Sequence, residues 1–552
     1  MTYIPGRLHP PVASAVVEKP EWDPTHVYAW KPANNYKGWK LIDRGEAGVD
    51  DASVIQSALD SLTSGRTWKE TVVLIGDFIV SQTIKLPSYT VLDLTQAKIK
   101  LSDDANVDIL TNSDSDSGNV EIEILGGVID GNKANQTAGQ TRLGIVLTKV
   151  TNFKIDGTTV KNVGTSDSND IAKGIDLVNC ERGEIISVYA TANNHYGIHL
   201  WECKDIVVRS CFSYGNERHG FGGSGNQDCK WIENYAIDNL LQGFWFRNLI
   251  NCLIKGNHAI STDGSGEIGI QIKQDTAETT GVAENNEIVD NVIVGFRDST
   301  YGHGIYLQNH IKNTLVKGNV IRECRLGALL VNAHYTDIVA NKFVNNTERD
   351  ILDVDGSSTS IKIANNYLFG CKRTSIETNC KYGKIAGNYI KNAGNEADNT
   401  YYGIYYRDRY YVDIKNNTIE SDATNKPAYG IYLSGDYAHH IIVKYNRIFG
   451  FATAAIGMTA TFGNEGSGGN EIKFNEGYTT ENSGTATITS GATSVTVSHG
   501  LVGTPAKIIV TPITPLGSAS KWWVTNITDT SFDIVVDSDP AQDVTFAWQA
   551  EV

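Results

Sequence analysis

Proline, methionine and long apolar runs are scarce in this sequence of 552 residues. Its 12 prolines are too few for a disordered proline-rich chain, and two methionines beside 25 tyrosines favour a rigid β-rich protein over a helical bundle. No run of 18 apolar residues occurs, so we expect no transmembrane helix. The first residues lack a charged segment followed by an apolar one, so we expect no signal peptide.

Net positive charge is also absent, because 63 Asp and Glu residues outnumber 47 Lys and Arg residues and give a formal net charge of −16. A general nucleic-acid binder needs net positive charge to displace counterions, and an anionic membrane surface attracts basic proteins, so we expect neither partner. A local basic patch would still allow an acidic sugar to bind.

Cysteine is present, but eight residues in a chain of this length do not make a disulfide framework. Cys180 and Cys203 are 23 residues apart, as are Cys229 and Cys252. Such spacing would place each pair in one column of a repeating coil, where a disulfide is geometrically allowed. We expect reduced, buried side chains, since a coil stacks identical residues in any case.

Glycine is abundant, with 53 residues, and part of it is periodic. A Gly-apolar-x-apolar motif begins at Gly174, Gly197, Gly220, Gly243, Gly269, Gly304, Gly327, Gly403 and Gly430, with several steps of 23 residues. One such rung cannot bury its apolar face alone, whereas stacked rungs close a continuous core. The repeat predicts an all-β protein, a right-handed parallel β-helix over residues 41–480, with loop insertions where the steps are longer.

A second motif, Asn-x-apolar, recurs out of phase with the glycines. It begins at Asn257, Asn291, Asn319, Asn341, Asn366, Asn388, Asn417 and Asn446. Asparagine tolerates left-handed backbone, and its amide can bond to a stacked copy on the next rung. We therefore expect a structural ladder at one turn of the coil.

The two ends of the chain lack this periodicity. Residues 1–40 are predicted to be an N-terminal arm or adaptor. Residues 50–62 predict a capped amphipathic helix that plugs the open end of the coil, with Val54, Ile55, Ala58, Leu59 and Leu62 on one face. Residues 481–552 alternate apolar and polar residues between turn signals and predict a small C-terminal β-sandwich-like domain.

One outer face of the predicted coil is rich in polar and aromatic residues. In Gly-apolar-x-apolar the x side chain points outward, which gives the column Asp176, His199, Gly222, Trp245, Gln271 and Tyr306. The residue before each glycine gives Lys173, Tyr196, His219, Gln242, Ile268 and His303, and the position two after x gives Val178, Trp201, Ser224, Arg247, Lys273 and Gln308. Loops at 262–267 and 296–301 would form the walls of a groove beside this face. Further along the coil, Leu329 and Leu352 occupy the x column, so the polar character of the face ends there.

The segment DRGEAGVDDASVIQSALDSL and the following VVLIGDFIVSQTIKLPSYTVLDL resemble the N-terminal part of the pectate lyase superfamily of single-stranded β-helix proteins. The likeness continues through GGVIDGN to about residue 480. This superfamily includes pectate lyases, polygalacturonases, alginate epimerases and phage tailspike depolymerases. The C-terminal segment is similar to modules that end viral tail spikes, which implies a homotrimer and a virion-associated or extracellular location.

Two motif comparisons within the superfamily bear on chemistry. Gly174-Ile175-Asp176 resembles the Gly-Ile-Asp of polygalacturonases, but His195 and Tyr196 stand where that family has its acidic pair. The run from Tyr196 to Glu202 resembles a mannuronan epimerase motif, as does Arg218-His219-Gly220-Phe221 one rung later. In the first run His199 and Trp201 replace the epimerase Asp and His.

We expect a polysaccharide partner, and β-elimination from an acidic glycan is the favoured chemistry. A base removes the proton beside the uronate carboxylate while a cation stabilises the resulting anion. The candidate catalytic residues are Tyr196, His199, His219, Arg247, Asp176 and Glu202. The candidate substrate-binding residues are Lys173, Trp201, Arg218, Trp245, Gln271, Lys273, His303 and Tyr306.

Two alternatives stay open. Hydrolysis needs two carboxylates that flank the bond, for which Asp176, Glu202 and Glu267 are available. A non-catalytic glycan-binding tail spike or adhesin would use the same face without turnover. We expect no required cofactor and no metal ligands, although a uronate lyase would leave room for Ca²⁺.

Overall fold

The computed structural model describes residues 13–33, 38–137, 142–165, 171–275, 281–354, 356–459 and 469–552. The chain divides into two units, residues 1–347 and 348–552, which we describe one at a time. In the described ranges almost all regular structure is β-strand, with one α-helix, α1 (Asp51–Asp60), and a 3-10 turn at Lys133–Asn135. No helix among these residues is long and apolar enough to cross a membrane.

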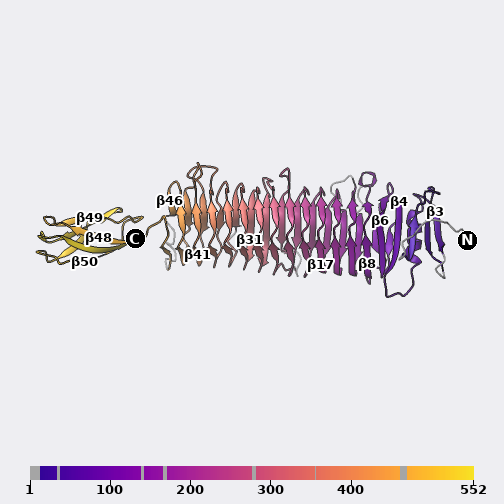
Figure 1. Cartoon of the computed structure of the whole chain (residues 1–552), viewed down its shortest axis with the longest axis horizontal. Coiled ribbons are helices and arrows are strands. Elements are labelled where there is room, and N and C mark those ends of the chain that lie inside the picture. The colour runs from indigo at the N-terminus through magenta and orange to yellow at the C-terminus, as the bar shows by residue number, and fades with distance from the viewer. Residues whose placement is uncertain are drawn as a thin grey trace. The chain divides into compact units, whose positions relative to one another are not determined.

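In the first unit, one strand of each rung belongs to a single parallel sheet (Figure 1). Its strands are β5 (Ile84–Leu86), β7 (Leu110–Asn112), β10 (Leu143–Thr148), β13 (Lys173–Val178), β16 (Tyr196–Trp201), β19 (His219–Ser224), β22 (Gln242–Arg247), β25 (Ile268–Lys273), β28 (His303–Lys312) and β31 (Leu326–His334). The register confirms the 23-residue rung, because Ile175 lies opposite Ile198 and Phe221 lies opposite Phe244. These side chains are fully buried and stack along the inside of the coil.

Each rung continues into two further strands that stack in the same way on the other faces. One series is β8 (Val120–Leu125), β11 (Thr151–Asp156), β14 (Glu181–Ile186), β17 (Lys204–Arg209), β20 (Lys230–Ile232), β23 (Leu253–Lys255), β26 (Glu287–Val289), β29 (Leu315–Lys317) and β32 (Asp337–Val339). The other is β9 (Val128–Asp130), β12 (Thr159–Lys161), β15 (Tyr189–Thr191), β18 (Phe212–Tyr214), β21 (Tyr235–Ile237), β24 (His258–Ile260), β27 (Val292–Val294), β30 (Val320–Arg322) and β33 (Lys342–Val344).

The asparagine ladder is present as predicted. The side-chain amide of Asn257 donates to Oδ1 of Asn291 at 3.0 Å, and that of Asn291 donates to Asn319 at 2.9 Å. Each amide also donates to a main-chain carbonyl one rung back, as Asn257 does to Trp231 at 2.9 Å. These buried amides are therefore satisfied along the stack, which identifies them as structural.

The N-terminal segment contributes strands to the sheet that contains β8 and β9. β1 (Ala15–Glu18) pairs in parallel with β4 (Glu70–Val80), β4 pairs with β6 (Thr90–Leu101), and β2 (His26–Pro32) is antiparallel to both β1 and β3 (Trp39–Glu46). The predicted arm therefore joins the coil through β1, and β2 and β3 extend the sheet beyond it with antiparallel strands. Residues 1–12 and 34–37 lie outside the described residues.

Helix α1 buries its apolar face as predicted, with Val54, Ile55, Ala58 and Leu59 inaccessible or nearly so. The predicted side-chain cap is wrong. Asp50 does not bond to the helix amides, because its carboxylate accepts the main-chain N–H of Glu46 at 2.9 Å.

The second unit continues with parallel strands of the same kind. The motif-bearing strands are β34 (Arg349–Val354), β37 (Ile376–Thr378), β40 (Tyr402–Arg407), β43 (Tyr429–Ser434) and β46 (Ala454–Met458). The remaining faces use β35 (Lys362–Ala364), β36 (Tyr367–Phe369), β38 (Lys384–Ala386), β39 (Tyr389–Lys391), β41 (Val412–Lys415), β42 (Thr418–Glu420), β44 (Ile441–Lys444), β45 (Arg447–Phe449) and β47 (Glu471–Lys473).

The C-terminal segment forms two three-stranded antiparallel sheets. One contains β48 (Glu481–Ile488), β53 (Val544–Glu551) and β50 (Lys507–Pro512); the other contains β49 (Ser494–Ser498), β52 (Ser531–Val536) and β51 (Trp522–Thr525). Ile488, Phe532, Phe546 and Trp548 share one apolar core, so each sheet covers the other. The predicted fold class, a right-handed parallel β-helix with a small C-terminal antiparallel β domain, is confirmed.

The eight cysteines are all free and buried, as predicted. The column that begins with Cys180 contains stacked thiols, and Cys203 donates to the carbonyl of Leu177 at 3.5 Å. Burial raises the pKa of the Cys203 thiol well above its ordinary value, which keeps it protonated.

Candidate functional site

The three outward columns predicted for the first unit are correct in register. Asp176 lies opposite His199, His199 opposite Gly222, and Gly222 opposite Trp245. The column continues through Gln271 and Tyr306 to Leu329, where its polar character ends. The parallel strands therefore bring side chains that are 23 residues or more apart onto one face.

Asp176, His199 and Lys173 form a hydrogen-bonded group at the start of this face. Nδ1 of His199 lies 2.7 Å from Oδ1 of Asp176, and Nζ of Lys173 lies 2.8 Å from Oδ2. Asp176 and His199 are 4% and 3% exposed. One carboxylate thus holds an imidazole with one oxygen and an ammonium with the other.

The protonation states in this group follow from burial and pairing. Burial raises the pKa of Asp176, but the hydrogen bond from His199 and the nearby Lys173 outweigh it, so the net pKa is below the ordinary value. Burial lowers the pKa of His199 despite the bond to Asp176. Asp176 is therefore ionised and His199 neutral near pH 7, so Nδ1–H donates to the carboxylate and Nε2 is the unprotonated nitrogen.

The Tyr196 ring lies among three histidines. Its centroid is 4.5 Å from that of His195, 4.5 Å from that of His199 and 4.6 Å from that of His219. The ring lies over Gly222, where a Cβ atom would be 2.2 Å from Cε1 of Tyr196. Burial raises the pKa of Tyr196 far above its ordinary value, so the phenol is protonated.

His195 and His219 are neutral as well. Burial, assisted by Arg218 and Lys173, lowers the pKa of His195 to about 3. Burial and the neighbouring His195 lower that of His219 well below its ordinary value. Nδ1 of each ring is buried without a hydrogen-bond partner, and Arg218 Nη1 lies 3.4 Å from Nε2 of His195. Buried polar atoms without partners are costly, and two of them lie beside Tyr196.

Two tryptophans and an arginine form the more open part of the face. The guanidinium of Arg247 lies 4.8 Å from the ring centroid of Trp245 and 5.8 Å from that of Trp201. Its Nη1 pairs with Asp275 at 2.9 Å. All three side chains are half-buried, so they present flat apolar surface and a cation to solvent.

The remaining predicted binding residues lie further along the coil. Gln271 is buried and donates to Gln308 at 3.1 Å, and Lys273 stands between Arg247 and Gln308 in the next column. His303 packs edge-on against Tyr306 with centroids 5.2 Å apart. Burial lowers the pKa of His303 to about 4, so this ring is neutral.

Glu202 is not part of this group. It has a φ of 50°, follows the last residue of β16, and is exposed at the corner of the coil. The left-handed turn directs the chain away from the face, so the structure does not bring Glu202 beside Asp176.

Glu267 and Asp298 come from the two loops that were predicted to wall the face. The loops contact each other, since the N–H of Arg297 donates to the carbonyl of Gly264 at 3.3 Å. Glu267 accepts a hydrogen bond from Gln242 at 3.0 Å, and burial, with the negative charge of Asp298, raises its pKa. Hydrogen bonds from the N–H groups of Tyr301 and Thr300 lower the pKa of Asp298. Sequence reasoning missed Asp298, whose only signal was its place in the loop.

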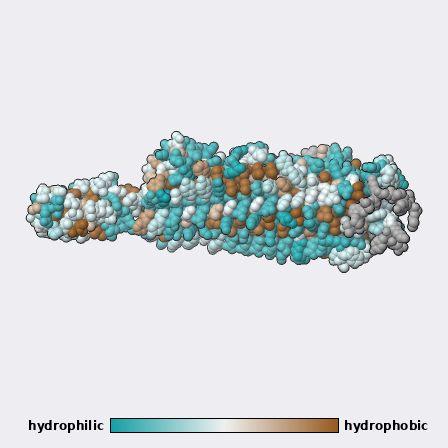
Figure 2. Space-filling view, viewed as in Figure 1, coloured by the Kyte–Doolittle hydropathy of each residue, from teal (hydrophilic) through white to brown (hydrophobic). Residues whose placement is uncertain are grey.

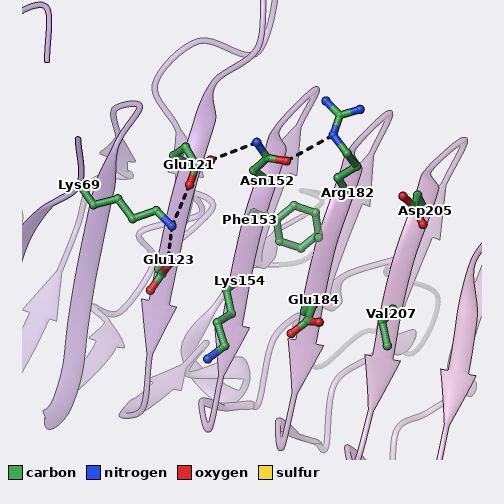
Figure 3. A pocket seen from close by; sticks show the side chains of 11 residues that line it. Lys69, Glu121, Glu123, Asn152, Phe153, Lys154, Arg182, Glu184, Asp205 and Val207 are labelled. Carbon is green, nitrogen blue, oxygen red and sulfur yellow. Dashed lines mark hydrogen bonds and ion pairs between the residues drawn. The ribbon is translucent and has the colours of Figure 1, made fainter. Parts of the chain in front are cut away.

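One hollow lies on a different face and contains none of the predicted site residues. It is a shallow hollow of about 400 Å³ across β8, β11, β14 and β17, with Phe153 at its floor (Figure 3). Its three cations, Lys69, Lys154 and Arg182, are each paired with a carboxylate. Among the described residues, no group of three or more His, Cys, Asp or Glu side chains is placed to hold a metal ion.

Comparison with known proteins places this chain among β-helix folds. Residues 125–297 match the sequence model of a family described as periplasmic copper-binding protein (NosD). No curated protein matches the sequence.

Among solved structures, a mutant tailspike protein of E. coli bacteriophage HK620 in complex with a pentasaccharide has a TM-score of 0.54. It is 13% identical, and the alignment covers 91% of this chain and 90% of that one. The Azotobacter vinelandii mannuronan C-5 epimerase AlgE6 A-module is 14% identical over 78% of this chain and 96% of that one, with a TM-score of 0.34. This chain therefore has the right-handed parallel β-helix fold that the HK620 tailspike also has.

Proposed function

We propose that this protein is a polysaccharide depolymerase that cleaves an acidic glycan by β-elimination at the Asp176–His199 face. The observation that carries the proposal is the bond between an ionised buried carboxylate and a neutral imidazole, beside a protonated phenol. An imidazole with its Nδ1–H bonded to a carboxylate is oriented for Nε2 to act as a base.

The reaction assigns a role to each group. Nε2 of His199 removes the proton on the carbon next to the uronate carboxylate, and Arg247 pairs with that carboxylate as negative charge develops. The new carbon–carbon double bond forms as the bond to the glycosidic oxygen breaks, and Tyr196 donates its phenolic proton to the leaving oxygen. The imidazolium of His199 then returns a proton to the phenolate, which restores both groups.

The two tryptophans support a sugar substrate. Trp201 and Trp245 offer flat apolar faces to the C–H surface of sugar rings, while Arg218 and Lys273 add positive charge along the same face. The HK620 tailspike structure with the similar fold contains a pentasaccharide. From the similarity to that tailspike we propose a virion-associated or extracellular location. We also propose that the reaction requires no cofactor.

Hydrolysis is the second candidate, and one observation favours it. Glu267 has a raised pKa and neighbouring Asp298 a lowered one, which is the arrangement of a general acid beside an ionised carboxylate. In that reaction Glu267 would protonate the leaving oxygen.

Incubation with a panel of acidic and neutral polysaccharides separates the two reactions. We expect new reducing ends together with rising absorbance near 235 nm, where unsaturated uronates absorb, and we expect Glu267→Gln to retain most of this activity. New reducing ends without absorbance, lost in Glu267→Gln, would favour hydrolysis and contradict the lyase. Binding without either product would identify a non-catalytic spike or adhesin.

We also propose that the protein is a homotrimer that associates through an aromatic column on another face. Tyr189, Phe212, Tyr235 and His258 stack along β15, β18, β21 and β24 with centroids 5.6, 4.7 and 4.6 Å apart. Tyr189 is 43% and Phe212 38% exposed. Contiguous exposed aromatic surface of this kind is typical of interfaces. Figure 2 shows that apolar residues also reach the surface among hydrophilic ones on the side in view.

Replacing both Phe212 and Tyr235 by glutamate is expected to abolish this association. Light scattering should give three times the chain mass of 60.2 kDa for the unmodified protein and one chain mass for the variant, because buried carboxylates without partners oppose association. Tyr335→Glu, at a tyrosine that is 61% exposed elsewhere on this unit, is the control and should remain trimeric. A monomeric unmodified protein at micromolar concentration would refute the trimer.

A further inference from the structure

Four tyrosines gather on one face of the second unit, in a region where the sequence indicated no site. Tyr402 and Tyr405 lie on β40, and Tyr429 and Tyr432 lie on β43 directly opposite them. All four side chains are half-exposed. The neighbouring Tyr406 is fully buried in the core, so the exposed four are not required to fill the interior.

The four rings are close enough to form one surface. Tyr402 stacks on Tyr432 with centroids 4.6 Å apart and an interplanar angle of 8°. Tyr405 lies 5.0 Å from Tyr402, and Tyr429 lies 5.0 Å from Tyr432. Aromatic rings at these distances stabilise one another, so the surface is held in place before any ligand binds.

A glycine on the next strand holds one ring against the sheet. Gly457 of β46 lies opposite Tyr432, and a Cβ atom at Gly457 would be 2.4 Å from Cε1 of Tyr429. The same arrangement occurs in the first unit, where Tyr196 lies over Gly222. In both places a missing side chain lets a tyrosine ring lie against the coil.

Charged and polar groups border the tyrosines. Glu377 is opposite Tyr405 and pairs with Arg407 at 3.0 Å and with Arg349. The guanidinium of Arg407 lies 5.6 Å from the ring centroid of Tyr405, whose hydroxyl accepts a hydrogen bond from Ser434 at 3.2 Å. The border thus supplies donors and an acceptor next to apolar ring faces.

We propose that Tyr402, Tyr405, Tyr429 and Tyr432 form a second, non-catalytic glycan-binding surface. Ring faces bind the C–H faces of sugars, and the phenol hydroxyls and Arg407 bind sugar hydroxyl or carboxylate groups. The choice of a glycan as ligand rests on the proposed function, whereas the surface itself rests on the geometry of the second unit. It would bind the glycan without cleaving it.

Affinity electrophoresis of the full chain tests the surface separately from turnover. Gels are cast with alginate, polygalacturonate, xanthan, colominic acid, hyaluronan or lipopolysaccharide, and the His199→Ala variant is used so that no gel is digested. We expect this variant to be retarded in at least one gel. Adding Tyr405→Ala and Tyr432→Ala should raise the apparent Kd in that gel at least tenfold.

Two controls distinguish binding from folding. Tyr405→Phe with Tyr432→Phe keeps the rings and should retain most of the retardation. Alanine at Tyr335 and Tyr445, which are 61% and 55% exposed outside this surface, should leave retardation unchanged.

Three results would overturn the proposal: no retardation in any gel, equal retardation after both alanine substitutions, or equal loss in the Tyr335 and Tyr445 control. Absence of turnover in the unmodified protein alongside tyrosine-dependent retardation would contradict the depolymerase and leave this surface standing.

Discussion

Replacing His199 by alanine is expected to lower kcat/KM on the polysaccharide by about 10²–10⁴-fold, the range typical of a lost general base. The coil should remain folded, because His199 lies on the outer side of β16, whereas Ile198 and Leu200, which are 0% exposed, fill the interior of the coil. Initial rates of absorbance at 235 nm measure the loss, and circular dichroism checks the fold. His26→Ala, on β2 and outside the candidate site, is the matched control and should keep full activity.

The pH dependence gives the same assignment an independent test. His199 must be neutral to act as a base, and burial lowers its pKa, so the acid limb of the pH profile should lie below the range of an ordinary imidazole. Asp176 favours the protonated imidazole, so Asp176→Asn should move this acid limb to still lower pH while it also reduces kcat. An acid limb that stays in place in Asp176→Asn would exclude His199 as the titrating base.

Substitution of Gly222 by alanine is the second change with a large expected effect. The added Cβ atom would meet the Tyr196 ring at 2.2 Å, so the ring must leave its position among the histidines. If Tyr196 donates the proton to the leaving oxygen, kcat should fall about 10²-fold or more. Tyr196→Phe should show a similar loss, because it keeps the ring and removes only the hydroxyl.

A glycine elsewhere provides the control for Gly222→Ala. Gly491 lies in the C-terminal domain, and a Cβ atom there would meet nothing within 4 Å. Its φ of 89° makes Gly491→Ala cost about 1 kcal/mol of stability, but turnover should be unchanged. If Gly222→Ala kept full turnover, the assigned position of Tyr196 in the reaction would be wrong.

The candidate face on the first unit shows what could be predicted from the sequence. Its 23-residue step was enough to predict that Asp176 and His199 stack in one column, because rung length alone sets the register of a coil. It could not predict that the two side chains share a hydrogen bond, or that burial keeps His199 neutral. Those properties depend on how neighbouring rungs cover the face.

The position of a side chain was hardest to predict where the local backbone departs from the repeat. Glu202 was included because it follows Trp201 in a matching motif, but its left-handed conformation places it at an exposed corner. The tyrosine surface of the second unit was missed because Leu329 and Leu352 interrupt the polar column and longer insertions hide the period beyond them. Its signal was present in the Gly-Ile-Tyr runs at Gly403 and Gly430.

The sequence by itself determined the coil, the asparagine ladder, the capping helix and the C-terminal sandwich. Each of these follows from short-range periodicity and from the need to bury apolar side chains between stacked rungs. Only the tertiary structure decided the protonation of His199, the position of Tyr196 over Gly222 and the pairing of the loops that carry Glu267 and Asp298. These depend on contacts between residues far apart in the chain, where desolvation and close packing act together.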